Sequence, residues 1–314
     1  MKTIFWKDES KGIPLAQRVV TVGMFDGVHL GHQKTVSTTV ALAREHGHEA
    51  AVVTFDRHPQ AVVSGKAPPL ITSLRHRLYL FEQIGADLCL VLHFDRALAA
   101  TTAREFLEGI LIHRLGAKVV VLGQNASFGK GGEGNCAFLD RMSLEYDIEC
   151  VQVPLVDLAG RTVSSTTVRD AVTQGDLETA AAMLGRPFSL LGTVVHGDNI
   201  GATLGFPTAN LDLHHEVRPP RGVYAARIQL DGRTYVAVVN IGVRPTLRAG
   251  SDERVEVHII GFDGDLHGRD LDVAVLKRLR DEMPFESADA LAAQIRRDCD
   301  AARQAFSSFA GNSS

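Results

Sequence analysis

The chain has 314 residues, of which 45% are hydrophobic and 22% are charged, and its formal net charge is -4. This composition excludes a fibrous or disordered protein, and the length predicts two domains of roughly 130 to 190 residues. The slightly acidic balance provides no basic surface for nonspecific nucleic-acid binding, so we expect no nucleic-acid partner. A phosphorylated small molecule is the expected anionic ligand.

Membrane and disulfide chemistry are also not expected. The N-terminal stretch MKTIFWKDESKG lacks the apolar core of a signal peptide, and no apolar run is long enough to span a membrane. The cysteines show no CxxC spacing, and Cys89 and Cys150 lie in strand-like runs where buried free thiols are common. We therefore expect a soluble protein of the reducing cytoplasm with no membrane partner. The sequence leaves open whether it forms a homo-oligomer.

In chain order, the first half alternates strand and helix patterns. The expected strands cover residues 18–23, 49–55, 86–94, 117–123 and 148–156. The expected helices cover residues 32–47, 73–85, 102–116 and 137–147. Apolar strands separated by helices predict a Rossmann-like α/β domain whose parallel sheet is covered on both faces. Ligands of such sheets bind beyond the carboxyl ends of the strands.

The stretch VGMFDGVHLGHQKTV, residues 22–36, lies where the first of these strands becomes a helix. Gly23 lets the strand end in a sharp turn, and Gly31 permits close backbone approach. The amino end of a helix attracts anions. His29 and His32 could donate hydrogen bonds to oxygens that gain charge at a reacting phosphorus. This stretch therefore predicts a phosphate site.

Two other interpretations of the histidine pair stay open. Zinc is the weaker one, because no cysteine or acidic cluster except Asp26 lies near the HxxH spacing. The other is a pair of solvated histidines at a helix start, which the flanking glycines disfavour.

The motif GMFDGVHLGH resembles the HxGH signature of nucleotidyltransferases, in the GxFDGxHxGH form of bacterial FAD synthetases. That family implies a second anion-binding element, and VSSTTVRDAV matches its SSTxxR segment. The resemblance implies that His29, His32 and Arg169 act on the reacting phosphates, since arginine offers paired donors to phosphate oxygens. It also implies ATP and phosphate contacts from Gly23, Phe25, Asp26, Gly31, Ser165 and Thr166.

Two further stretches, VVTFDRHP and LGQNASFGKGGEGN, resemble the flavin-side loops of the same family. Arg57 and Met24 depart from the family pattern, which usually has proline and asparagine at these places. The resemblance implies an aromatic contact between Phe128 and the flavin. It assigns the flavin pocket to His58, Pro59, Asn125 and Phe128.

The pattern changes after two short helical segments, residues 166–176 and 177–185. From Phe188 onward the strands alternate apolar and polar residues, and the DG at Asp231 is a strong hairpin signal. A second FDG, residues 262–264, is interpreted as a hairpin turn without chemistry. This half predicts an antiparallel barrel or sandwich closed by a helix near residues 287–306, with Ser287 as its N-cap. We expect domains 1–186 and 187–314.

The C-terminal half carries the stretch HGDNIGATLGFPTANL, residues 196–211, which resembles the GxPTAN motif of riboflavin kinases. Its glycines, Gly197 among them, let backbone amides turn toward a ligand, and Pro207 stiffens the loop. Thr208 and Asn210 offer oxygens to magnesium. The resemblance implies ATP binding by Gly201, Gly205 and Pro207.

In this family the glutamate of the EVHI strand, here Glu256, is the base that deprotonates the riboflavin 5'-hydroxyl. The whole resemblance spans about Val19 to Phe306. It implies a bifunctional riboflavin kinase/FMN adenylyltransferase that uses ATP, riboflavin and FMN as substrates with Mg2+. The alternatives are a paralogue active in one step or on a flavin analogue, and a non-catalytic flavin- or nucleotide-binding regulator.

Overall fold

The computed structural model describes the chain except residues 7–11, 197–200, 202–203, 216, 244–252 and 312–314. Backbone contacts divide it into two compact units, Met1–Thr167 and Val168–Ser314. This division falls inside helix α7 (Ser165–Gln174), whereas the sequence pattern predicts a boundary at residue 186. Within the described residues, no helix is long and apolar enough to cross a membrane.

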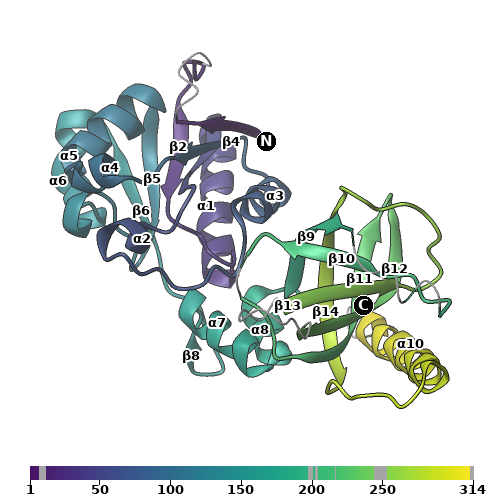
Figure 1. The fold of residues 1–314 in the computed structure, drawn as a ribbon. Helices are drawn as coiled ribbons and strands as arrows, with labels where there is room; N and C mark the ends of the chain where they lie inside the picture. The colour runs from purple at the N-terminus through teal and green to yellow at the C-terminus, as the bar shows by residue number, and fades with distance from the viewer. Residues whose placement is uncertain (7–11, 197–200, 202–203, 216, 244–252, 312–314) are drawn as a thin grey trace. The chain divides into compact units, whose positions relative to one another are not determined.

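The first unit is built on a six-stranded sheet whose strands are all parallel, which confirms the predicted α/β domain (Figure 1). The strand order is β1-β4-β3-β2-β5-β6. Because β3 lies on one side of β2 and β5 on the other, the direction of winding switches at β2, where ligands of such sheets bind. The strands are β1 (Lys2–Phe5), β2 (Arg18–Val22), β3 (Glu49–Phe55), β4 (Leu88–Leu92), β5 (Ala117–Gly123) and β6 (Glu149–Val153).

Strand β1 is the one strand of this sheet that the sequence pattern does not predict. It pairs with β4 at the edge of the sheet, and Ile4 is the only one of its four residues that is buried. A four-residue run with a single buried side chain shows no periodicity of its own. Its structure therefore comes from pairing with a strand more than eighty residues away in sequence.

Helices cover both faces of this sheet, as predicted. Helices α1 (Leu30–His46) and α3 (Leu74–Ile84) pack on one face (Figure 1). The other face is covered by α5 (Ala103–Phe106), by η1 (Leu107–Arg114) and by α6 (Cys136–Tyr146). The predicted helix over 102–116 thus begins as an α-helix and continues as a π-helix. The remaining elements are α2 (Pro59–Val63), α4 (Arg96–Ala100), η2 (Lys130–Gly132), β7 (Asp157–Leu158) and β8 (Arg161–Thr162).

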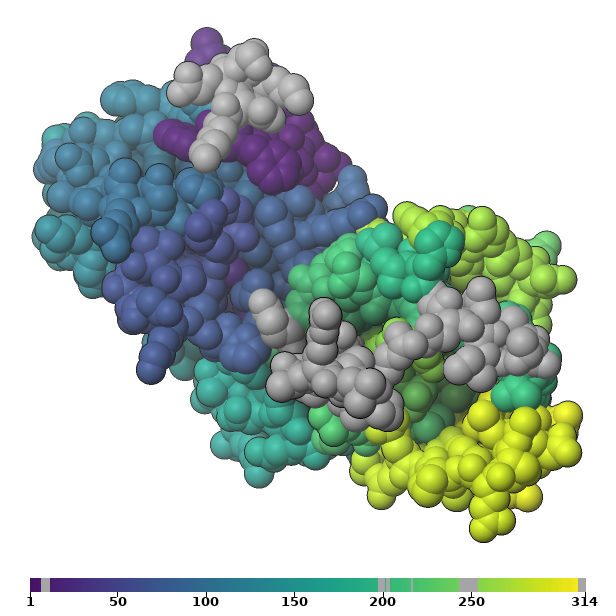
Figure 2. Space-filling view, in the orientation of Figure 1, coloured from purple at the N-terminus to yellow at the C-terminus, as the bar shows by residue number. Residues whose placement is uncertain are grey.

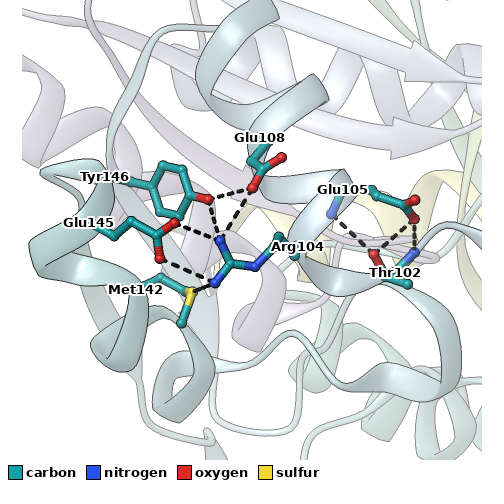
Figure 3. Close-up of polar contacts among 7 residues, drawn as sticks. All are labelled: Thr102, Arg104, Glu105, Glu108, Met142, Glu145 and Tyr146. Atoms are coloured by element: carbon teal, nitrogen blue, oxygen red, sulfur yellow. Dashed lines mark hydrogen bonds and ion pairs between the residues drawn. The ribbon is translucent and has the colours of Figure 1, made fainter.

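A polar cluster joins α5 and η1 to α6 (Figure 3). The Arg104 guanidinium donates to Glu145 at 2.7 Å and to the Tyr146 hydroxyl at 2.5 Å. Tyr146 in turn donates to Glu108, and this hydrogen bond is the largest cause that raises the pKa of Tyr146 to about 12. Thr102 and Glu105 form a capping box at the start of α5. The contacts of Arg104 and Glu108 hold α6, which follows the 124–135 loop, against the preceding helices.

The expectation of a free thiol at Cys150 is wrong, because Cys150 forms a disulfide with Cys136. The bond joins the first residue of α6 to β6 across a sequence separation of 14 residues. Spacing alone did not indicate it, since folding brings the two residues together from consecutive elements. Cys89 and Cys299 are free and buried.

The second unit is a closed six-stranded antiparallel barrel, as the alternating pattern predicts (Figure 1). Helix α10 (Ala288–Gly311), the yellow segment at the lower right of Figure 2, packs on β11, β12 and β14, and Ser287 caps it as expected. Asp231 and Gly232 have φ of 49° and 76° in the β11–β12 hairpin, which confirms that turn. The other elements are α8 (Leu177–Leu184), β9 (Ser189–Val195), β10 (Ala209–Leu213), β11 (Gly222–Leu230), β12 (Arg233–Val243), β13 (Glu253–Ile259) and β14 (Asp270–Arg280).

The interpretation of the second FDG as a hairpin turn is wrong. The barrel order is β10-β13-β12-β11-β14-β9, so β13 and β14 are not neighbours. Residues 260–269 instead cross from one strand to a distant one. Local turn residues look the same in both cases, and only the pairing of the strands distinguishes a hairpin from a crossover.

Candidate active sites

The turn after β2 has an unusual backbone. Phe25 and Val28 have φ of 53° and 41°, and Gly27 has φ of 82°. A positive φ is rare for non-glycine residues and is an outlier for a β-branched valine. Such backbone persists only where surrounding contacts hold it, and it gathers at functional sites.

Asp26 supplies much of this restraint. Its carboxylate is 2% exposed and accepts hydrogen bonds from the backbone amides of Ile71 and Thr72, each at 3.0 Å. The Thr72 hydroxyl also accepts from the amide of Gly27 at 2.8 Å. These contacts place Asp26 as an organiser of the turn. Its role among the ATP and phosphate ligands stays a prediction.

The two histidines stack at the start of α1. His29 is the N-cap, its ring accepts from the backbone amide of His32 at 3.4 Å, and the ring centroids are 3.6 Å apart. A Cβ at Gly31 would lie 3.1 Å from the His29 ring, and a Cβ at Gly23 would lie 2.9 Å from the Phe25 ring. Both glycines therefore make room for rings of the site.

The surroundings of His32 favour a neutral imidazole. Burial, followed by the charges of His29 and Arg77, lowers the pKa of His32 well below its usual value. Its Nδ1 is buried and has no hydrogen-bond partner among the described residues. The Phe25 ring meets the His32 ring edge-on, with centroids 5.2 Å apart. At neutral pH His32 can thus donate one hydrogen bond to a substrate oxygen without carrying a charge.

The structure brings the hydroxyl-rich segment to this turn. The Ser165 hydroxyl donates to the carbonyl oxygen of Asp26 at 2.9 Å, across 139 residues of sequence. Val163, two residues before Ser165, is also close to this turn, because its carbonyl oxygen lies 3.9 Å from the position that a Cβ on Gly31 would take. Thr166 is exposed next to Ser165, and Arg169 follows one turn later, in the part of α7 that belongs to the second unit. The phosphate roles of these residues stay predictions.

The predicted flavin-side residues follow β3 and β5, the two neighbours of β2. His58 caps α2 by accepting from the amide of Gln60 at 3.2 Å, with Pro59 beside it, and Asn125 is exposed. Phe128 is 4% exposed and packs between Phe106 and Phe138. These positions lie at the carboxyl edge of the sheet, and their contact with a flavin stays a prediction.

Sequence reasoning missed a polar pair at the same edge. Asp56 follows β3 and lies 2.5 Å from the His93 ring, which follows β4. Asp56 also accepts from the amide of Phe94 at 3.1 Å. The signal was present in the polar residues directly after two apolar strands, which fold to one edge of a parallel sheet.

In the barrel, Glu256 stands at the centre of a polar row. It pairs in register with Asn210 on β10 and with Asn240 on β12. With Thr208 and Gly201, these residues line a cavity of about 270 Å³. Asn240 was not predicted, although a lone polar residue inside the apolar VVNIG run was a usable signal.

The rest of this first cavity is mostly apolar. Arg280 and Asp298 close one side with a largely buried ion pair, 2.8 Å between Nη2 and Oδ2. Apolar walls beside a few converging polar groups are typical of small-molecule sites. The apolar lining consists of Leu204, Phe206, Val223, Val238, Met283, Phe285, Leu291 and Ile295.

A second cavity of about 330 Å³ lies on the other side of Thr208, and it is more polar. Pro207 and Thr208 line it together with residues 262–267. The second FDG, which the sequence predicts to be a turn without chemistry, therefore borders a cavity. Pro207 also accepts a hydrogen bond from the His258 ring at 2.8 Å. Gly205 has φ of 83°, which suits glycine, whereas Gly197 lies outside the described residues. Glu256 and His258 of β13 line the first cavity, whereas Val257 and Ile259 line the second, so alternate residues of this strand face different cavities.

The oxygens around Glu256 suit a hard cation. A hydroxyl from Thr208, an amide oxygen from Asn210 and the carboxylate are ligands that Mg2+ accepts, with substrate phosphates completing its shell. Among the described residues, no group of three or more His, Cys, Asp and Glu could hold a metal. The zinc interpretation of His29 and His32 therefore gains no support from the part of the chain that the structure describes.

Comparisons with known proteins match both halves. The FAD synthetase family matches residues 14–167, and the riboflavin kinase family matches residues 184–306. The chain is 38% identical over 290 residues to the bifunctional riboflavin kinase/FMN adenylyltransferase of Escherichia coli K12, covering 92% of each chain. It is 35% identical over 299 residues to the protein of that name from Bacillus subtilis 168, covering 94% of each.

A solved structure also resembles the whole chain. The crystal structure described as the macrolide-efflux protein from Streptococcus pneumoniae is 30% identical, with a TM-score of 0.82. The likeness covers 96% of this chain and 99% of the other. It supports the two-part fold.

Proposed function

The chain belongs to the family of bifunctional riboflavin kinase/FMN adenylyltransferases, and from this premise we propose how its residues divide the two reactions. It phosphorylates riboflavin to FMN with ATP, and it adenylylates FMN to FAD with a second ATP, releasing pyrophosphate. Matches to both families, one in each half, favour this two-step enzyme over a one-step paralogue or a non-catalytic regulator.

The barrel carries the kinase step. We place riboflavin in the apolar cavity beside Glu256, and the phosphates of ATP at the polar end of the same cavity, which Gly201 and Thr208 line. Glu256 takes the proton of the 5'-hydroxyl as that oxygen attacks the γ-phosphorus, and ADP leaves. Asn210 and Asn240 flank Glu256 in register on the neighbouring strands, where their amide groups would orient its carboxylate. The register pairing of these three residues is the observation that carries this assignment.

Magnesium fits this site. Thr208 and Asn210 would hold it beside the phosphates of ATP. When bound, the ion neutralises charge that develops on the phosphate oxygens. The protein's own part is to orient the hydroxyl and accept its proton.

The turn after β2 carries the adenylyl step. An oxygen of the FMN phosphate attacks the α-phosphorus of ATP, the bond to the bridging oxygen breaks, and pyrophosphate leaves. His29 and His32 donate to the reacting phosphate, and Ser165, Thr166 and Arg169 act on the leaving pyrophosphate. No covalent intermediate with the enzyme is needed, since positioning and charge neutralisation lower the barrier.

Chromatography of the flavins tests both steps. Purified protein incubated with riboflavin, ATP and Mg2+ is expected to yield FMN and then FAD. If FAD never forms even when FMN is supplied directly, the first unit is not an adenylyltransferase. Omission of Mg2+, with EDTA present, is expected to abolish FMN formation.

Two substitutions test the division of labour. His32→Ala is expected to abolish FAD formation and to spare FMN formation. Glu256→Ala is expected to abolish FMN formation while FAD still forms from supplied FMN. Each variant thus contains its own control in the other half. If both substitutions damaged both reactions equally, the two-site assignment would fail.

A further inference from the structure

Beyond the residues above, Arg77 on α3 holds the ends of two strands together. It is fully buried, with 0% of its surface exposed. Its Nη1 donates to the carbonyl oxygen of Met24 and to the hydroxyl of Thr54, each at 2.8 Å, and its Nη2 donates to the carbonyl oxygen of Phe55 at 3.0 Å. Thr54 also donates to Met24, at 3.2 Å. One guanidinium therefore ties the carboxyl ends of β2 and β3 together.

These two ends lead into the two sides of the site. Met24 directly precedes the turn in which Phe25 and Val28 adopt positive φ, and Phe55 directly precedes the predicted flavin-side loop. Asp26 and Thr72 restrain the middle of the turn, and Arg77 restrains its beginning by holding the carbonyl oxygen of Met24. A strained turn whose start is released can relax toward ordinary φ values, which would move His29.

The charge of Arg77 acts on the same site. Burial lowers its pKa to about 10, so it stays protonated at neutral pH. A buried cation disfavours a second positive charge nearby, and it is among the causes that lower the pKa of His32. The side chain thus fixes backbone and adds to the larger effects of burial and His29 that keep the His32 imidazole neutral.

We propose that Arg77 is a positioning residue for adenylyl transfer. It sets the position of the histidine turn, the turn after β2 that leads to His29 and His32, relative to the flavin-side loop. This inference rests on the proposed function of the first unit. It touches neither substrate in the proposal, and it acts through Met24, Thr54 and Phe55.

The chain provides a matched control in Arg18. It is 1% exposed and likewise donates to backbone carbonyls, those of Leu115 and Pro14, each at 2.9 Å. It lies at the amino end of β2, the opposite edge of the sheet from the histidines. Loss of either arginine leaves buried acceptors without donors and is expected to destabilise the first unit. Only the loss of Arg77 is expected to change the chemistry.

The test compares Arg77→Met, Arg77→Gln and Arg18→Met in the full chain, below their unfolding temperatures. The Arg77 variants are expected to lose roughly 10- to 100-fold in kcat for FAD formation, since small misplacements at a reacting centre have effects of this size. KM for FMN is expected to rise as well. A further variant, Arg77→Lys, keeps three N–H donors and is expected to recover much of the lost kcat for FAD formation. FMN formation by the barrel is expected to stay unchanged in all variants.

Amide exchange followed by NMR separates this inference from the proposed function. The amides of Gly27 and Val28, which are hydrogen-bonded in the turn, are expected to exchange faster in the Arg77 variants than in Arg18→Met. If wild-type protein made no FAD, the proposed function would fail and the exchange would still test the restraint. The inference is overturned if the folded Arg77 variants keep wild-type kcat and KM, or if Arg18→Met shows the same kinetic loss.

Discussion

The substitution Asp26→Asn measures how much the hydrogen bonds of the Asp26 carboxylate, which restrain the turn after β2, contribute to the unfolding free energy of the first unit. The carboxylate accepts two backbone amides at 3.0 Å in a buried setting. Both amides donate to Oδ1, and the Ile71 amide also lies 3.2 Å from Oδ2, so asparagine keeps its oxygen at Oδ1 but places an NH2 group against the Ile71 N–H. Losing the negative charge that strengthens both hydrogen bonds and facing two buried donors toward each other is expected to cost about 2 to 4 kcal/mol. For a unit of this size the unfolding midpoint should fall by roughly 4 to 16 °C.

Fluorescence of the single tryptophan isolates this effect. Trp6 lies in the first unit, packs on its core and is covered by the Arg114 guanidinium 4.6 Å from the ring centroid. Its emission during thermal unfolding therefore reports on this unit and not on the barrel. Asp147→Asn is the control, because that side chain is 91% exposed and its pairing with Lys118 in solvent should contribute little to stability. An Asp26→Asn protein with wild-type stability and a raised KM for ATP would refute the bracing role and make Asp26 a ligand alone.

Three more outcomes are expected. Replacing Cys136 and Cys150 together by serine should lower the unfolding free energy by about 3 kcal/mol under oxidising conditions, and added reductant should abolish the difference from wild type. In an NMR titration from about pH 8 to 5.5, the His32 ring should not protonate near the free-histidine pKa of about 6.5, because burial lowers its pKa in the fold. A titration midpoint of about 6.5 for His32 would contradict the burial of its ring. Gly31→Ala should lower the rate of FAD formation roughly tenfold, because the new methyl group pushes the His29 ring aside. The rate of FMN formation and the unfolding free energy should stay near wild type. An unchanged rate of FAD formation would show that the position of the His29 ring is not critical.

Sequence reasoning reached the first site because its evidence is local. Glycine spacing, an apolar strand and a following helix place His29 and His32 at a strand end without any knowledge of the rest of the fold. The backbone of the turn was out of reach. Positive φ at Phe25 and Val28 is imposed by contacts from residues far along the chain, and no local preference for it exists in either side chain.

In the barrel, the limit of sequence reasoning was strand pairing. The hairpin at Asp231 was predictable, because a two-residue hairpin turn requires positive φ and Asp-Gly tolerates the positive φ that it adopts here. The FDG at residues 262–264 carries similar turn chemistry but leads into a crossover, since β13 and β14 pair with other strands. The same pairing places Asn240 beside Glu256, which no spacing in the sequence indicates.

The position of Thr208 has a consequence for inhibitor design. Because this one side chain borders both cavities of the barrel, a compound held in the first cavity can carry a second group toward the more polar one. Where the linker spans both sites, the second binding event becomes intramolecular, and affinity rises by roughly 10² to 10⁴ over the separate halves without a new contact. The first half of such a compound would compete with riboflavin, while the second half would add affinity from outside the substrate site.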